Sequence, residues 1–282
     1  MRNIRVRQLI STTIVTLCAV AVLIALVPLA LILFYVVQQG IQGLNLDFFR
    51  RTPVPVGELG GGMGNAILGS AIVVGLGALF AVPVGVLSGL YAAEYPGTRF
   101  GTLTRFAADT LNGVPSIVIG VFVYGIAVLP FRHFSGLAGG LALGIMMIPL
   151  IMRTTEELLL LVPSSLREGA LALGATRTRA VLTVILPAAL PGIMTGILLA
   201  LARIAGETAP LLFTTFNNQF WSTDVRQPMA TLTVQVFTFA IAPYEDWHRQ
   251  AWAGALVLVT TVLLCSLIAR VATARLEKLQ RG

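Results

Sequence analysis

The chain has 282 residues, of which 56% are hydrophobic and only 11% are charged. Because soluble domains carry about 25% charged residues, this composition excludes an ordinary soluble protein and indicates one that lies in a membrane. The net charge is +7, but the basic residues are scattered between hydrophobic runs and form no stripe, so the charge does not indicate a nucleic-acid-binding protein.

Six apolar runs predict six membrane-spanning helices, since a helix needs ~20 largely apolar residues to cross a bilayer. The runs cover residues 9–37, 66–93, 111–131, 134–152, 191–216 and 250–269. Lipid cannot satisfy backbone hydrogen-bonding groups, so a chain of this kind should form an all-α bundle. We expect one transmembrane domain over residues 1–282, with no separate soluble domain.

The first run is preceded by Arg2, Arg5 and Arg7, which could mimic the start of a signal peptide. Its apolar stretch is longer than the ~7–15 residues of a signal peptide, and no small-residue cleavage pattern follows, so we expect a retained helix. Cys18 and Cys265 both fall inside predicted spans, where buried small apolar residues are a better interpretation than a disulfide or a metal site.

The second run is rich in small residues. Gly85 and Gly89 are four residues apart, a spacing that permits close contact between two helices in a membrane. We interpret these glycines as packing residues.

The loop between the fourth and fifth spans, residues 153–190, should contain a short helix. Ser165–Glu168 reads as a Ser-x-x-Glu capping box after the breaker Pro163, and Gly174 is well placed to end the helix. Such a helix of about two turns is unstable alone in water and needs a surface to lie on, either the bundle or another protein. Residues on one face would be Leu166, Ala170 and Leu173.

The fifth run contains two charges, Arg203 and Glu207. In a continuous helix this spacing places both on one face, where they either neutralise each other or serve a pathway. A charge at the bilayer centre costs from ~2.5 to well over 10 kcal/mol, so intramembrane ionisable residues are functional by default. Gly206 and Pro210 should kink the helix beside the charges, because Pro210 cannot donate to the carbonyl of Gly206.

The loop at residues 217–249 contains an uncharged stretch, Gln227 to Tyr244, whose threonines and glutamines make it too polar for a seventh span. We assign it to an extracytoplasmic loop or a partly inserted helix. With six spans, the positive-inside rule places both termini in the cytoplasm. The inner segments then hold most of the basic residues, and the outer loops hold Arg50, Arg51, Arg132, Arg226 and Arg249.

The inner loop resembles the "EAA" motif of binding-protein-dependent ABC importer permeases, EAA-x3-G-x9-I-x-L-P. The matching residues are Glu168, Ala170, Gly174 and Val184–Pro187, with Gly169 and Val184 as mild departures. The resemblance implies a type I permease fold and a coupling helix that docks on an ATPase subunit. The docking residues would be Leu166, Arg167, Glu168, Ala170, Leu173 and Gly174.

Three further segments resemble the phosphate permeases of this family: "GGGMGNAILGS" (60–70), "NGVPSIVIG" (112–120) and "ARIAGETAPLLFT" (202–214). One departure is "LLCSLIAR" (263–270), where an asparagine would be expected. The resemblance implies a multi-pass inner-membrane subunit of a phosphate importer, partnered by a second permease, a cytoplasmic ATPase dimer that binds ATP and magnesium, and an extracytoplasmic phosphate-binding protein. No cofactor or metal is expected on this chain, and no nucleic acid.

On this interpretation Arg203 and Glu207 line the translocation pathway. A permease for another oxyanion, such as sulfate or molybdate, or for an amino acid would share the inner motif. A membrane-embedded enzyme would need clustered His, Asp or Glu at membrane depth, whereas His133 and His248 fall in outer loops. A stand-alone channel would not need a docking helix.

Overall fold

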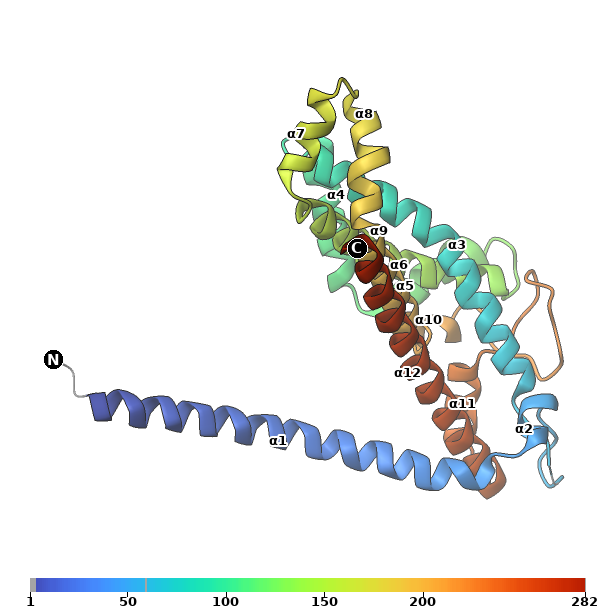
Figure 1. Ribbon diagram of the computed structural model, residues 1–282. Helices are drawn as coiled ribbons and strands as arrows, with labels where there is room; N and C mark the ends of the chain where they lie inside the picture. Colours follow the sequence, from blue (N-terminus) through green and yellow to red (C-terminus); the bar gives the residue numbers. More distant parts are fainter. Residues whose placement is uncertain (1–3, 59, 282) are drawn as a thin grey trace.

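The computed structural model describes residues 4–58 and 60–281, and the described residues form helices and loops without any strand (Figure 1). This confirms the predicted all-α fold. The helices are α1 (Ile4–Gly43), α2 (Leu46–Arg50), α3 (Gly64–Glu94), α4 (Arg99–Gly113), α5 (Ser116–Val123), α6 (Gly136–Leu160), α7 (Ser164–Ala172), α8 (Arg177–Ala180), α9 (Leu186–Ile204), α10 (Ala209–Leu212), α11 (Leu232–Ala240) and α12 (Glu245–Arg281), with π-helical segments η1 (Tyr124–Val128) and η2 (Val181–Ile185).

Five helices in the described residues are long and apolar enough to cross a membrane, and a bent pair brings the number to six. The bent pair corrects the predicted straight span at 111–131: α4 and the α5–η1 helix meet at 104°. The cause is Pro115, because the residue before a proline is pushed out of the helical region. Val114 accordingly has an extended backbone, with φ −75° and ψ 128°.

The fifth spanning helix runs from Arg177 to Ile204, earlier in the chain than the predicted 191–216. The connection between the fourth and fifth helices therefore covers residues 161–176 and is shorter than the predicted 153–190 loop. Pro187 and Pro191 do not break this helix. Pro187 lies in the first turn of α9, directly after the wide turns of η2, and such local adjustments let membrane helices tolerate proline.

The core forms where α3, α6 and α9 pack together. A Cβ atom on Gly85 would lie 2.8 Å from Ile151 Cβ, and one on Gly89 would lie 2.5 Å from the backbone oxygen of Met152. The predicted close contact at these glycines is confirmed, and the partner helix is α6. Fully buried side chains at the centre of this core include Val73, Leu143, Met147, Ile151 and Ile193.

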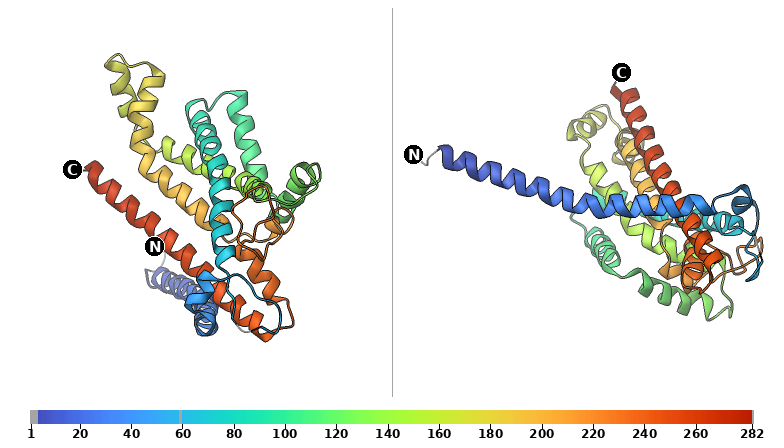
Figure 2. Two further views of the ribbon diagram at one scale, coloured as in Figure 1. Left: turned by 90° about the vertical axis from the view of Figure 1, so that its right-hand side faces the viewer. Right: turned by 90° about the horizontal axis from the view of Figure 1, so that it is seen from below.

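Helix α1 leaves the bundle and points away from it (Figures 1 and 2). Its C-terminal part packs against α12, where the Tyr35 and Trp252 rings meet edge to face with centroids 5.1 Å apart. Cys18 on α1 and Cys265 on α12 are both exposed free thiols. This corrects the expectation that they are buried, because the faces that carry them have no helix packed over them in the described part of the chain.

The ambiguous stretch at 227–244 contains α11, a helix of nine residues. A helix of that length rises about 14 Å, roughly half the ~30 Å hydrocarbon core, so it is not a seventh span. It packs against α12 and α3 and buries Leu232, Val234, Gln235 and Phe239.

Candidate functional site

Arg203 and Glu207 lie on either side of a helix end. α9 stops at Ile204 with Ala205 as its C-cap, and Glu207 lies in the connection to α10. Within the described chain no ion pair or side-chain hydrogen bond joins the two charges. The expectation that they share one face of a continuous helix is therefore wrong.

The break follows from the local sequence. Glycine is a poor helix former, and Pro210 has no N–H to donate to the carbonyl of Gly206. The chain instead makes two tight turns, in which Gly206 N–H donates to the Arg203 carbonyl (3.3 Å) and Glu207 N–H donates to the Ile204 carbonyl (3.0 Å). A helix restarts at Ala209 with Pro210 in its first turn. The two residues expected to kink the helix thus interrupt it.

Both charged residues line one cavity of about 320 Å³. The cavity is also lined by the bend between α4 and α5, residues 111–116, of which 112–116 form the "NGVPS" segment. Remaining lining residues are Ile119, Met146, Leu150 and Ile204. The cavity therefore lies where two interrupted helices face each other, an arrangement in which half-helix ends can meet a solute at membrane depth.

Asn112 and Ser116 line the cavity, and no role was predicted for either of them. α5 begins at Ser116 after Pro115, so the cavity wall includes the positive end of a helix dipole and its first backbone N–H groups. The signal that could have revealed them is the Asn-Gly-x-Pro-Ser pattern, which marks a break followed by a new helix. Arg203 is exposed and Glu207 half-buried, so both side chains are open to a solute in this cavity.

The two interrupted segments pack against each other, and their backbones come closest at Gly120. A Cβ atom on Gly120 of α5 would lie 2.6 Å from the Cα of Pro210 in α10. Only a glycine lets the two backbones approach this closely. The contact fixes the α4–α5 bend relative to the α9–α10 break, and with it the shape of the cavity.

A second hollow, of about 410 Å³, meets the first at Arg203 and Leu150. It runs between α6 and α9 and is mainly apolar, lined also by Thr154, Leu158, Gly192, Thr195, Gly196, Leu199 and Ala200. Arg203 therefore stands at the junction of a polar and an apolar hollow.

Helix α7 is the predicted short helix of the inner loop. It begins at Ser164 with Pro163 as N-cap and without a side-chain cap, so the predicted capping box at Ser165–Glu168 does not form. Gly174, at φ +82°, ends the helix as predicted. The N–H of Gly174 donates to Leu171 (2.9 Å) and the N–H of Ala175 to Ala170 (3.1 Å), which is a Schellman motif.

None of the nine residues of α7, all within the described chain, is buried. Leu166 is 44% exposed and Leu173 is 91% exposed, so the face expected to carry Leu166, Ala170 and Leu173 is not packed on the bundle. α7 and α8 form a hairpin that projects from one end of the molecule (Figures 1 and 2).

The same end of the molecule carries a network of arginines and carboxylates. Arg153 of α6 contacts Asp109 of α4 and Glu156 of its own helix, and Arg105 of α4 pairs with Glu156. Arg167 of α7 pairs with Glu94 of α3, and this hydrogen bonding raises the pKa of Arg167 above its usual value. Charge-assisted contacts thereby join α4 to α6 and α7 to α3.

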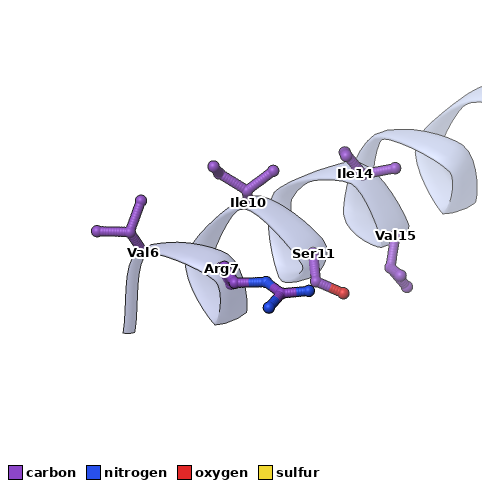
Figure 3. Close-up of a pocket in the computed structure, with 6 residues that line it drawn as sticks. All are labelled: Val6, Arg7, Ile10, Ser11, Ile14 and Val15. Atoms are coloured by element: carbon purple, nitrogen blue, oxygen red, sulfur yellow. The ribbon is translucent and has the colours of Figure 1, made fainter. Parts of the chain in front are cut away.

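A further hollow lies along the N-terminal half of α1 (Figure 3). Its lining residues are Val6, Arg7, Ile10, Ser11, Ile14 and Val15, all from this one helix. No second element closes over them in the part of the chain that the structure describes, so we do not count this hollow as a site.

The family model described as "Binding-protein-dependent transport system inner membrane component" matches residues 81–282. The chain belongs to this family. Curated relatives include the phosphate transport system permease protein PstA of Yersinia pestis, 48% identical over 86% of this chain and 83% of the relative, and that of Haemophilus influenzae, 47% identical over 87% of each. A more distant one, from Methanocaldococcus jannaschii, is 36% identical over 86% of this chain and 85% of the relative.

Solved structures with the same fold include an inward-facing MetNI methionine ABC transporter, with a TM-score of 0.63 and 19% identity over 76% of this chain and 97% of that chain. A second is an amino acid ABC transporter, with a TM-score of 0.55 and 19% identity over 74% of this chain and 92% of that chain. These likenesses confirm the type I ABC importer permease fold. The family member described here is a multi-pass inner-membrane transport subunit.

Proposed function

We propose that the chain is the permease subunit that conducts inorganic phosphate in an ATP-driven importer. The observation that carries the proposal is the cavity between the two interrupted helices, which presents the guanidinium of Arg203 beside the first turn of α5. The relatives at 44–48% identity, named as phosphate transport permeases, support phosphate as the anion.

Arg203 gives phosphate a transient binding site. Its guanidinium matches phosphate oxygens with two parallel hydrogen bonds and stays charged under all relevant conditions. Glu207 lines the same cavity and repels the anion, which keeps the site weak enough to release it. Because no carboxylate in the described residues pairs with Arg203, its donors are available to the solute.

Energy comes from partners of this chain. α7 docks on a cytoplasmic ATPase dimer, which binds ATP and magnesium, while this chain hydrolyses no nucleotide and binds no cofactor or metal. A second, homologous permease covers the open sides of the two hollows and completes the pathway. An extracytoplasmic phosphate-binding protein delivers the solute to the outer loops, including residues 217–249.

The test is accumulation of labelled phosphate by cells whose only copy of this chain carries Arg203→Gln. We expect uptake to fall at least tenfold, since a lost charged hydrogen bond costs about 1.5–3 kcal/mol and 1.4 kcal/mol is a factor of ten. Arg203→Lys should retain part of the uptake, because lysine keeps the charge and loses the bidentate geometry. Arg270→Gln is the matched control: this exposed arginine of α12 does not line the cavity.

Membrane assembly of each variant is checked by co-purification with the ATPase. Normal phosphate uptake by both Arg203→Gln and Glu207→Gln would contradict the role of the cavity. Purified complexes in vesicles, supplied with sulfate, molybdate or an amino acid in place of phosphate, test the substrate. Accumulation of one of these solutes but not of phosphate would replace phosphate in the proposal.

A further inference from the structure

We infer that Glu94, the last residue of α3, is a positioning residue that ties the coupling helix α7 to the core of the permease. The inference rests on the proposed function, because it concerns how docking at α7 reaches the pathway. Glu94 is only 5% exposed. Its two carboxylate oxygens each accept a hydrogen bond of 2.5 Å from Arg167 of α7, the bidentate geometry that gives arginine–carboxylate pairs their directional strength.

A second arginine reaches Glu94 from the other side of the α7–α8 hairpin. Arg177 Nε lies 3.5 Å from a carboxylate oxygen of Glu94, and an Nη group of Arg177 donates to the backbone carbonyl of the same residue. The Arg177 guanidinium also lies over the Tyr95 ring, 4.6 Å from its centroid. Arg167 precedes the Gly174 turn and Arg177 follows it, so one carboxylate holds both arms of the hairpin.

Apolar packing does not join α7 to the core. None of the described residues of α7 is buried, and its neighbours along the hairpin are α8 and η2. The ion pair with Glu94 therefore joins α7 to α3, the helix that packs against α6 through most of the core. Breaking this ion pair would leave the nearly buried carboxylate of Glu94 with less positive charge beside it, which is strongly unfavourable. Movement of α7 must then carry the end of α3 with it.

The end of α3 is also tied to α4 and α6. Arg105 of α4 donates to the backbone carbonyl of Ala92, 2.6 Å away, and pairs with Glu156 of α6. A push on α7 is thus transmitted through Glu94 to the C-terminus of α3, and from there to α4, whose far end forms the wall of the Arg203 cavity. This is a contiguous chain of packed and charge-paired groups of the kind that carries coupling between sites.

The test uses the complete purified complex in lipid nanodiscs. The rate of ATP hydrolysis is measured with and without binding protein and phosphate, and the quantity compared is the ratio of the first rate to the second. We expect Glu94→Gln to lower this ratio about tenfold and Arg167→Lys to lower it less, since lysine keeps the charge but not the bidentate pair. The double variant should be no worse than Glu94→Gln alone, because the two residues act as one unit. Glu157→Gln and Arg179→Gln are matched controls, exposed and without a side-chain ion pair in the described structure, and should keep the ratio.

A second measurement does not depend on ATP hydrolysis. Spin labels at Ser164 of α7 and Leu87 of α3, both exposed, are placed in a background with Cys18 and Cys265 replaced. We expect one narrow distance distribution in the parent chain and a broad one with Glu94→Gln. If Glu94→Gln changes neither the ATP-hydrolysis ratio nor the distribution of label distances, the inference is overturned. If Glu94→Gln fails to assemble, the same two unchanged results with Arg167→Lys overturn it. If the parent complex itself shows no phosphate stimulation, the proposed function fails, and the label distances still decide whether Glu94 positions α7.

Discussion

Gly89 lies where α3 crosses α6, and its missing side chain allows that crossing. A Cβ atom there would lie 2.5 Å from a backbone oxygen of Met152, whereas one on Gly75, on the same helix, would meet nothing within 4 Å. We expect Gly89→Ala to destabilise the protein by about 1–3 kcal/mol through overpacking. Gly75→Ala, the matched control, should stabilise the helix by up to about 1 kcal/mol. Thermal unfolding of the purified complex in detergent measures both, and equal midpoints would contradict the packing argument.

Residue spacing predicted some of these features and missed others. The separation of Gly85 and Gly89 correctly indicated close helix contact, because that argument needs only one face of one helix. The prediction that Arg203 and Glu207 share one helix face was wrong, because it assumed a continuous helix across Gly206 and Pro210. The role of Glu94 could not be predicted: its partner Arg167 lies 73 residues further along the chain, and a lone carboxylate at the end of an apolar run does not indicate such a partner.

At the scale of elements, the end of α7 depends on a backbone conformation that only glycine adopts easily. Gly174 has φ +82°, and a left-handed backbone costs other residues roughly 1–2 kcal/mol. Gly174→Ala should therefore loosen the turn and expose the amides of residues 170–175. Gly169→Ala lies inside α7, where an added Cβ meets nothing within 4 Å, and it should instead stabilise the helix.

Hydrogen–deuterium exchange of the α7 segment separates the two variants. We expect faster exchange at residues 170–175 with Gly174→Ala and slower exchange across α7 with Gly169→Ala. Similar exchange in both variants would show that the Schellman turn does not determine the end of α7.

The short elements show how far sequence patterns reach. One glycine predicted the end of α7, but the Ser165 pattern did not predict its start, because the N-cap is Pro163, two residues earlier in the chain. The bend at Pro115 and the break at Gly206 are both marked by local breakers. That the two interruptions face each other follows from the contact between Gly120 and Pro210, and no local pattern specifies a tertiary contact of that kind.

At the scale of the whole molecule, hydropathy located the spanning helices because lipid allows few alternatives to a helix. Hydropathy placed the start of the fifth spanning helix too far along the chain, because Arg177 and Arg179 are charged residues of the kind found in loops. Long arginine side chains near helix ends can reach the membrane surface, and Arg177 reaches the end of α3. Charge near the end of a spanning helix is therefore compatible with a continuous helix and does not by itself mark a loop.

The orientation of the whole molecule in the membrane is predicted from its charges and can be tested. The arginine-rich end with α7 should face the cytoplasm, and the loop around Phe220 should face outward. In a cysteine-free background, single cysteines are placed at Leu173, 91% exposed, and Phe220, 76% exposed.

A membrane-impermeant maleimide should label position 173 only in inside-out vesicles stripped of peripheral protein, and position 220 only in right-side-out vesicles. Restoring the ATPase should then protect position 173 and leave position 220 reactive, because only the first lies on the projecting hairpin. The reverse labelling pattern would place α7 outside the cell, where no ATP-hydrolysing partner could reach it, and would remove the route by which we propose that this permease is driven.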